Sequence, residues 1–366
     1  MSEQPLIYWF ETGGRRWRAR EVKGTEAIAR PFRFEIAFRL DLGESFDPDA
    51  VVAADAALEL RRGEVVRRID AVVTSSDVTA QLTGVAEIRV VIEPRLALAR
   101  ERVDIRLFRD RTAPEIVVEV LSALGIATEL RLAEVYERRP YCVQHRESDL
   151  DFVQRLLEDE GIFYYFIPGD VMVLGDSPAA YQPIPGASTL PFRAGLGMDH
   201  QSDDAIIAVG SCARLTPRKV TLRDFNPETP KLDMQVEAAT RCPGGPEWYD
   251  YPGEYAAPPV GQRKARLRAE AIDCSTASLK GRSLCGRLMP GCTFTLLGAP
   301  PPVESRGQVV TRVEHAWSWD RGGFSSAFEA QGDDVAFRPP LETVAPTLVN
   351  PVTGFVTGPP GEDIHT

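Results

Sequence analysis

The side chains best able to do chemistry in this sequence are its cysteines, histidines and acidic residues. The six cysteines and four histidines form no CxxC, HxxxH or HExxH pattern, the spacings typical of zinc ligands. They are Cys142, Cys212, Cys242, Cys274, Cys285, Cys292, His145, His200, His315 and His365. The nearest approach to a ligand pair, His145 with Glu147, precedes a helix start and is expected to make surface hydrogen bonds. We therefore predict no metal, no cofactor and reduced cysteines.

A hydrolase would need a serine or cysteine beside a base, or two carboxylates across a cleft. GRSLCG at residues 281–286 is the string closest to the G-x-S-x-G turn, and it does not fit. Spacing alone leaves open a glycosidase pair among five acidic residues of one helix, which we expect on its solvent side. They are Asp149, Asp151, Glu158, Asp159 and Glu160. With no GxGxxG or GxxxxGK[ST] loop for phosphate either, we predict no catalytic residues and no enzyme.

Two capped helices occupy the middle of the sequence. The first follows T-A-P-E, with Thr112 as cap and Gly125 as its end. Its apolar face consists of Ile116, Val117, Val120, Leu121 and Leu124. The second begins at the cap Ser148 and stops at Gly161, and IFYYF at 162–166 then predicts a buried strand. Its apolar stripe consists of Leu150, Val153, Leu156 and Leu157.

Strand patterns lie on both sides of these helices. In PFRFEIAFRL, apolar residues from Phe32 to Leu40 alternate with mostly polar ones, which predicts a half-buried antiparallel strand. Similar runs before residue 100 are 17–22, 57–62, 65–75 and 87–94, a spacing that suggests a small barrel. Strands return at 205–211, 219–225 and 307–319, and Val309, Thr311, Val313 and His315 are expected on one face of the last.

A helix expected at Pro258 to Gly281 interrupts this second set of strands. It carries a basic run that we interpret as a solvated face, since charge runs on helices usually are. The run consists of Arg263, Lys264, Arg266 and Arg268. After residue 338 the sequence becomes rich in proline and contains no lysine or arginine, which is typical of an extended linker.

Composition excludes several functions. With 42 Lys and Arg against 53 Asp and Glu, the net charge of −11 opposes binding to nucleic acid or anionic lipid. No apolar run approaches the roughly 18 residues that a membrane span needs. The start, MSEQPLIYWFETGG, has neither the basic beginning nor the apolar stretch of a secretory signal. We therefore expect no nucleic-acid partner, no membrane span and folding in the cytoplasm.

The sequence resembles the N-terminal hub region of VgrG spike proteins of type VI secretion systems and their relatives in myophage tails. The most specific segment is YCVQHRESDLDFVQRLLEDEGIFYYF at 141–166. Other similar segments are 22–40, 94–125, 283–298, 307–315 and 355–366. The resemblance implies a β-rich α+β fold with two similar β-barrels flanking and interrupted by α/β elements. The expected domains are 1–100, first barrel; 101–204, α/β middle; 205–338, second barrel with helical insertion; 339–366, linker and beginning of an OB-type domain.

The same resemblance implies a structural function. Three copies of two like barrels would form a pseudo-sixfold ring that matches a hexameric tube. The implied partners are a homotrimer, an Hcp-type tube hexamer, baseplate components, and a PAAR-type tip and effectors carried on a needle that this sequence lacks. Either the sequence is cut at a domain boundary, which we favour, or a separate chain supplies the remaining segments. The implied location is the bacterial cytoplasm during assembly, followed by expulsion. The alternatives are a tail-hub or baseplate protein of a phage or phage-derived particle and, less favoured, a cell-wall hydrolase.

Overall fold

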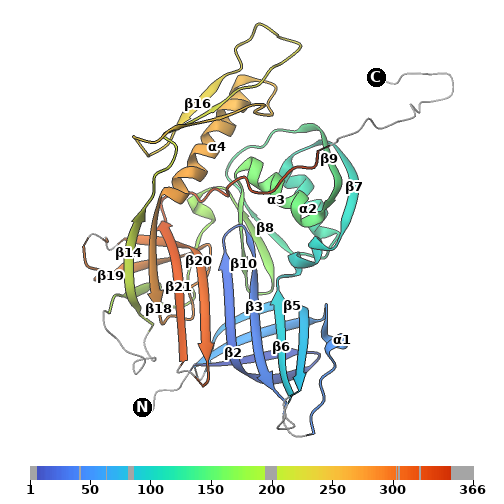
Figure 1. Cartoon of the computed structure of the whole chain (residues 1–366), viewed down its shortest axis with the longest axis vertical. Helices are drawn as coiled ribbons and strands as arrows, with labels where there is room; N and C mark the ends of the chain where they lie inside the picture. Colours follow the sequence, from blue (N-terminus) through green and yellow to red (C-terminus); the bar gives the residue numbers. More distant parts are fainter. Residues whose placement is uncertain are drawn as a thin grey trace, which may run out of the picture.

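The computed structural model describes residues 6–40, 43–62, 64–80, 86–193, 204–301, 303, 306–320 and 323–347. Two β-barrels lie side by side, a mixed α/β region packs above them, and an excursion containing a long helix projects beyond both (Figure 1). Within the described residues, no helix is long and apolar enough to cross a membrane.

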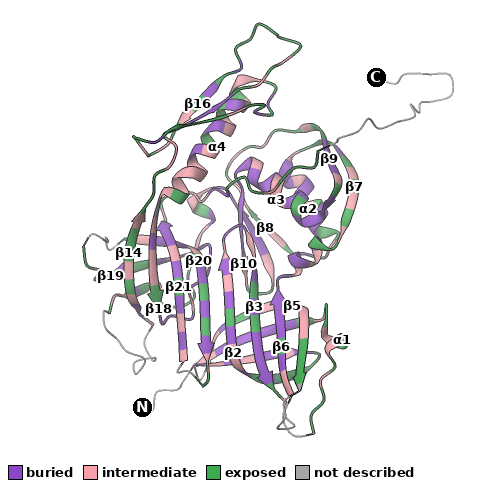
Figure 2. Cartoon of the chain, viewed as in Figure 1, coloured by how far each residue is buried: buried purple, intermediate pink, exposed green. Residues whose placement is uncertain are grey.

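The first barrel is an antiparallel ring of six strands in the order β1-β4-β5-β6-β3-β2, closed by pairing between β1 and β2. The strands are β1 (Ile7–Thr12), β2 (Arg15–Ala27), β3 (Arg30–Arg39), β4 (Asp55–Arg62), β5 (Glu64–Ala80) and β6 (Ala86–Glu93), with the short helix α1 (Pro48–Val51) before β4. The alternation predicted from Phe32 onward is confirmed, because Phe32, Phe34, Ile36 and Phe38 all face the core. Figure 2 shows buried and exposed positions alternating along these strands.

Gly24 on β2 leaves the space into which the ring of Phe34 packs. A β-carbon at Gly24 would lie 2.1 Å from Phe34 Cε1. Phe34 in turn stacks on His315 with ring centroids 5.8 Å apart. The missing side chain at residue 24 therefore permits an aromatic contact between the two barrels.

Gly24→Ala is expected to destabilise the protein by about 1–3 kcal/mol, since the added methyl group overpacks a buried ring. Gly210→Ala is the matched control, because Gly210 also lies in a strand and a β-carbon there meets nothing within 4 Å. Urea unfolding of the two variants measures the difference. Equal stability of both variants would contradict the packing role of Gly24.

The second barrel is formed by strands from the rest of the chain. They are β12 (Gln182–Pro183), β13 (Thr189–Pro191), β14 (Ile206–Ala213), β18 (Ala277–Ser283), β19 (Cys292–Leu297), β20 (Gly307–Ser318) and β21 (Gly323–Gly332). The order β20-β21-β18-β14 continues through a bridge between Ile206 and Phe192 to β13, and β13 pairs with β19, which returns to β20. The ring is thus closed near Phe192 by one bridge.

Pairing between β2 and β20 joins the two barrels into one sheet. Residues 21–27 of β2 pair with β20 from Arg312 to Ser318, while the start of β2 pairs with β1 inside the first ring. The predicted β-rich α+β class with two barrels is therefore confirmed. The domain boundaries stay predictions, although β12 and β13, which precede residue 204, pair with β19.

The middle region contains the two predicted helices. Its elements are η1 (Arg95–Arg100), β7 (Val103–Arg111), α2 (Ala113–Ser122), β8 (Thr128–Arg131), β9 (Arg139–Ser148), α3 (Asp149–Glu160), β10 (Phe163–Ile167), β11 (Val171–Gly175) and η2 (Pro178–Ala180). Both predicted caps are confirmed, because Thr112 Oγ1 accepts from Glu115 N at 3.3 Å and Ser148 Oγ accepts from Asp151 N at 3.0 Å. Gly161 ends α3 with a φ of 68°, in the left-handed region that favours glycine.

The excursion consists of β15 (Lys219–Leu222), β16 (Val236–Ala239), β17 (Glu247–Asp250) and α4 (Pro258–Thr276). The helix predicted at Pro258 to Gly281 is thus too long, because residues 277–283 are β18 and pair with β14 and β21. At the other end of the chain, residues 339–347 run without helix or strand. The predicted beginning of an OB-type domain falls on residues 348–366, outside the described residues.

Candidate functional surfaces

A buried charged cluster connects the two barrels. Glu26 of β2 accepts hydrogen bonds from Arg67 of β5 at 2.7 and 2.5 Å, and His315 Nε2 of β20 lies 2.7 Å from Glu26 Oε1. Arg67 Nη1 also donates to the carbonyl of Leu288 at 3.3 Å, which brings in the second barrel again. All three charged or titratable side chains are buried. The cluster therefore fixes the relative position of the barrels.

The electrostatics of the cluster follow from burial and pairing. Burial by itself raises the pKa of Glu26, but Arg67 and His315 outweigh it and hold the pKa at about 2. Burial lowers the pKa of His315 below its usual value, against the opposing pull of Glu26. The cluster thus holds an ionised Glu26–Arg67 pair beside a neutral imidazole at neutral pH.

Sequence reasoning found only one member of this cluster. Val313 and His315 share the buried face of β20 as predicted, whereas a bulge between Val310 and Arg312 interrupts the alternation at Thr311. Glu26 and Arg67 were missed. The sequence could have indicated them, because each is a charged residue at a strand position whose alternation predicts burial.

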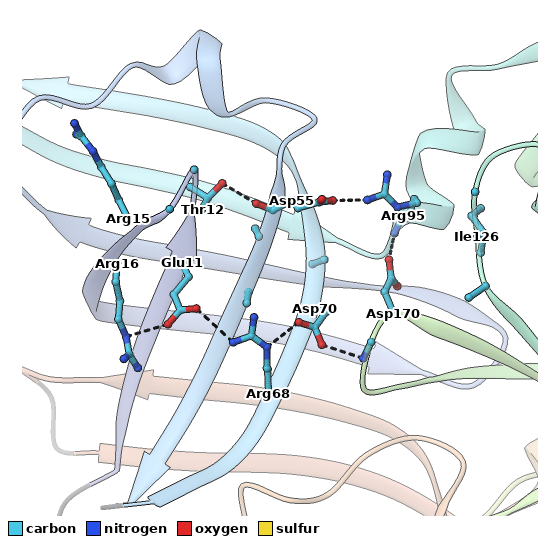
Figure 3. A pocket seen from close by; sticks show the side chains of 18 residues that line it. Glu11, Thr12, Arg15, Arg16, Asp55, Arg68, Asp70, Arg95, Ile126 and Asp170 are labelled. Carbon is cyan, nitrogen blue, oxygen red and sulfur yellow. Dashed lines mark hydrogen bonds and ion pairs between the residues drawn. The ribbon is translucent and has the colours of Figure 1, made fainter.

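A hollow of about 830 Å³ lies between the first barrel and the α/β region (Figure 3). A chain of charges crosses its wall, with Arg68 bonded to Glu11 at 3.3 Å and to Asp70 at 2.8 Å. Asp70 then accepts from Gly169 N at 2.9 Å, in the turn that joins β10 and β11. Positive and negative side chains alternate here, so the hollow is a polar seam between the two regions.

Asp170 in the same seam has an unusual environment. Its Oδ2 accepts from Arg95 N at 2.7 Å, while its Oδ1 is buried with no hydrogen-bond partner among the described residues. Burial raises the pKa of Asp170 from 3.8 to about 7. The raised pKa means that the folded protein favours the protonated carboxyl. Asp170 therefore lowers the stability of the fold at pH values where this carboxyl is ionised.

The sign of the resulting pH dependence is fixed by that shift. A carboxyl whose folded pKa is raised contributes stability below its unfolded pKa of 3.8, and the contribution is lost as pH rises through about 7. Asp170→Asn should remove this loss, because asparagine does not ionise. Between pH 4 and pH 8 the free energy of unfolding of the variant should therefore rise relative to that of the wild type, by on the order of 2–4 kcal/mol. Denaturant unfolding across that range measures the gain.

Asp110→Asn is the control for the Asp170 experiment, because Asp110 is an exposed aspartate with a similar positive φ of 53°. This control measures how much the change from aspartate to asparagine alters stability at a left-handed backbone position when the side chain is not buried. A stability difference between Asp170→Asn and wild type that does not change with pH would show that burial does not raise the pKa of Asp170.

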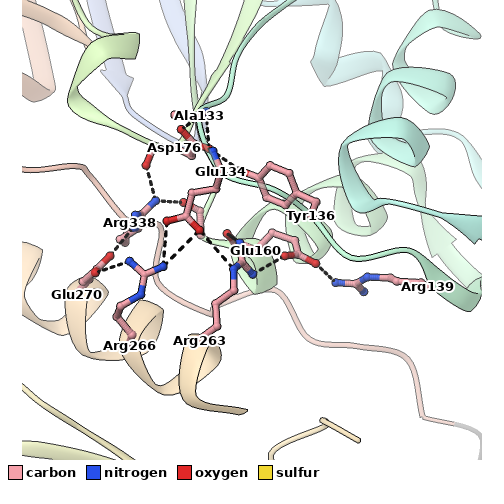
Figure 4. Close-up of polar contacts among 11 residues, drawn as sticks. Ala133, Glu134, Tyr136, Arg139, Glu160, Asp176, Arg263, Arg266, Glu270 and Arg338 are labelled. Carbon is pink, nitrogen blue, oxygen red and sulfur yellow. Dashed lines mark hydrogen bonds and ion pairs between the residues drawn. The ribbon is translucent and has the colours of Figure 1, made fainter. Parts of the chain in front are cut away.

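Three of the four residues of the basic run on α4 pair with acids of the α/β region, so the interpretation of the run as a solvated face is wrong (Figure 4). Arg263 bonds Glu160 at 2.7 Å, and Arg266 bonds Glu134 at 2.9 Å. Lys264 pairs with Asp159 of α3 at 2.8 Å, whereas Arg268 pairs at 2.8 Å with Asp250 of β17, inside the excursion. Through Arg263, Lys264 and Arg266 the run attaches the excursion to α3 and to the loop before β9.

Arg338 completes this attachment from the end of the second barrel. Its Nη1 donates to the carbonyls of Gly161 at 3.0 Å and Asp176 at 2.7 Å, and its Nε donates to Glu270 of α4 at 2.7 Å. The side chain is buried. One arginine therefore satisfies the carbonyl that ends α3 and holds α4 against it.

The predicted solvent side of α3 is also wrong for three acidic residues. Asp149, Glu158 and Glu160 are buried. Asp149 accepts from Gln144 and Arg106, and Glu158 accepts from the backbone N–H groups of residues 342 and 343 at 2.9 and 2.8 Å. Asp149 is covered by side chains of β7 and β9, whereas the returning chain covers Glu158 and α4 covers Glu160. Asp151 is exposed, as predicted, and caps α3 with Ser148.

The remaining predicted chemistry is distributed through the fold. His145 N donates to Glu147 at 3.4 Å, and the buried Glu147 pairs with Arg155, so this is not the surface contact that we predicted. Burial raises the pKa of the Cys285 and Cys292 thiols to about 11. The six cysteines, all within the described ranges, form no disulfide. Over those ranges no three His, Cys, Asp or Glu side chains are grouped to hold a metal.

Two β-barrels that share one sheet, with an α/β region and a helical excursion between their strands, are the architecture of a tail-hub protein. Residues 25–321 match the family model of the phage tail baseplate hub (GPD). The chain therefore belongs to this family, whose members are structural hub proteins.

Relatives of known name point to one branch of this family. The chain is 28% identical over 362 residues to the type VI secretion system spike protein VgrG1b of Pseudomonas aeruginosa, covering 94% of this chain and 49% of that protein. It is 30% identical to VgrG4b of the same organism, covering 94% of this chain and 45% of the relative. The chain thus spans about half the length of these spike proteins.

Solved structures share the fold. The E. coli c3393 protein, a type VI secretion system component described as similar to the T4 tail proteins gp27 and gp5, matches with a TM-score of 0.69 at 22% identity, over 91% of this chain and 79% of that one. A 43 kDa tail protein of prophage MuSo2 from Shewanella oneidensis matches with a TM-score of 0.66 at 12% identity, over 90% of this chain and 99% of that one. The confirmed fold class rests on these likenesses.

Proposed function

We propose that the chain is the structural hub of a type VI secretion spike, in which three copies form a base of pseudo-sixfold symmetry. The observation that carries this proposal is the joining of two barrels through β2 and β20, held by the buried Glu26–Arg67 pair. Two like barrels per chain become six around a threefold axis. Such a base can meet a sixfold tube without leaving unpaired surfaces.

The proposed partners are those that the resemblance to VgrG spike proteins implies. They are two further copies of the chain, an Hcp-type tube hexamer, baseplate components, and a PAAR-type tip and effectors joined through segments beyond the hub. The net charge of −11 supports protein partners over nucleic acid. The proposed role is structural rather than enzymatic, with assembly in the bacterial cytoplasm followed by expulsion from the cell.

Light scattering of the purified chain, followed by electron microscopy with rings of the tube protein, tests the proposal. A trimer that caps one end of the ring with sixfold-matched contacts is expected. A chain that stays monomeric and leaves the tube ends bare at high concentration would overturn the proposal.

A second candidate is a tail-hub or baseplate protein of a phage or phage-derived particle. The full coverage of a prophage tail protein from Shewanella oneidensis supports it, since 99% of that chain aligns with this one. Preference for phage tail-tube rings over Hcp-type rings in the same microscopy experiment would favour this candidate.

A further inference from the structure

The chain passes over α3 after it leaves the second barrel (Figure 1). Residues 340–347 have neither helix nor strand, and all of them except Thr343 are exposed. We name residues 340–347 the exit segment. Among the described residues, its polar contacts are made at Glu342 and Thr343 alone. The course of the exit segment is therefore fixed at one place.

That place is the carboxylate of Glu158 on α3. Its Oε2 accepts hydrogen bonds from the backbone N–H groups of Glu342 at 2.9 Å and Thr343 at 2.8 Å, and its Oε1 accepts one from Thr343 Oγ1 at 2.9 Å. Two successive backbone N–H groups that point at one anion form a nest, an arrangement that binds anions well. The side chain of Glu158 is 3% exposed, so water competes little for these bonds. Glu158 therefore acts as a clasp on the exit segment.

Arg30, the first residue of β3, connects the clasp to the first barrel. Its Nη1 lies 3.6 Å from Glu158 Oε1, and its Nη2 pairs with the carboxylate of Glu342. The preceding residue, Ala29, donates its N–H to the carbonyl of Tyr164 in β10 at 2.8 Å, so the start of β3 is itself anchored to the α/β region. The exit segment is thus bonded both to a helix of the α/β region and to a strand of the first barrel.

Apolar packing contributes little to this hold. A cavity of about 430 Å³ lies between the start of the exit segment and α4, and Pro340 and Leu341 line it. Leu341 is 46% exposed, whereas Arg338, just before the exit segment, is buried. Beyond the buried Arg338 and Pro339, the position of the chain therefore depends on the polar contacts of the clasp.

We propose that Glu158 and Arg30 set the direction in which the chain leaves the hub and transfer axial load between the exit segment and the rest of the fold. A spike that is expelled must carry the segments that follow its hub, and an irregular chain passes force to the fold where it is bonded to it. With the clasp, force on Thr343 reaches α3 and β3 directly. Without the clasp, the chain would pivot after the buried Pro339. This inference rests on the proposed hub function and names the residues that make the connection.

Glu158→Ala tests the clasp by hydrogen exchange of the full chain. The backbone N–H groups of Glu342 and Thr343 lose their acceptor, so their exchange should accelerate on the order of 10- to 100-fold. Glu342→Ala is the matched control, because it removes the pair with Arg30 but keeps both N–H donors. Exchange at residue 343 in this control should change less than about 5-fold. Unchanged exchange in Glu158→Ala would overturn the clasp.

Optical-tweezers pulling between tags at the two termini tests the transfer of load. The exit segment should be released at a lower force in Glu158→Ala than in the wild type, and an equal force would overturn the transfer. Should Glu158→Ala unfold by circular dichroism, Thr343→Pro replaces it in this measurement, because proline removes the N–H and Oγ1 donors of residue 343 without changing α3.

Both measurements concern a single chain and do not require three copies to assemble. A failed clasp or an unchanged release force therefore overturns this inference alone. A chain that stays monomeric beside rings of the tube protein overturns the proposed hub instead, whatever the exchange at residues 342 and 343.

Discussion

Arg67→Met should destabilise the protein by about 3–5 kcal/mol, because it leaves Glu26 buried without its cation. Arg67 donates two hydrogen bonds to Glu26 and one to the carbonyl of Leu288, and its side chain is only 7% exposed. Methionine fills a similar volume but donates nothing. Denaturant unfolding at pH 7 measures the loss.

Arg68→Met is the matched control, one residue along the same strand. Arg68 is 42% exposed and pairs with Glu11, Asp70 and Glu59, and the buried Glu59 would keep Arg16 and Arg61 as partners. Exposed pairs contribute little, so this variant should lose no more than about 1 kcal/mol. Equal losses in the two variants would show that the barrel junction has no special dependence on its buried pair.

The pH profile gives an independent measure of the same cluster. Glu26 has its folded pKa lowered to about 2 from 4.5, so it contributes stability above pH 4.5 that is lost as pH falls toward 2. His315 also has a lowered folded pKa, so stability begins to fall as pH drops below 6.5. Arg67→Met should flatten the acid part of the profile, since without Arg67 the pKa of Glu26 is no longer held low.

Arg338→Leu is the second substitution with a large expected effect, about 3–5 kcal/mol. It removes the donors that satisfy the carbonyls of Gly161 and Asp176 and breaks the pair with Glu270. Because Glu270 belongs to α4, the excursion should also loosen from α3. Hydrogen exchange should therefore accelerate in α4 and at the end of α3, in addition to the loss in unfolding free energy.

Arg266→Met is the comparison for Arg338→Leu. Arg266 also bonds Glu270, at 3.0 Å, and reaches Glu134 at 2.9 Å, but it is 44% exposed against 5% for Arg338. Its loss should cost no more than about 1 kcal/mol and leave exchange in α3 unchanged. Faster exchange in α3 after Arg266→Met, with none after Arg338→Leu, would contradict the role assigned to Arg338.

The local structure of this protein is determined by its sequence. The caps at Thr112 and Ser148, the stop at Gly161 and the alternation from Phe32 to Phe38 all depend on neighbours within a few residues, and each was predictable. Hydrophobic period and capping chemistry act over one turn or one strand. The hub family was likewise predictable, because it is carried by long segments of sequence.

The partners of charged residues were decided only by the tertiary structure. Glu26 meets Arg67 41 positions away and His315 289 positions away, and Arg263 meets Glu160 103 positions away. A charge run on a helix gives no sign of whether another element will cover it, so the basic run of α4 and the acids of α3 were both predicted as exposed. Burial of charge depends on which strands and helices come together, and that is fixed by the packing of the whole chain.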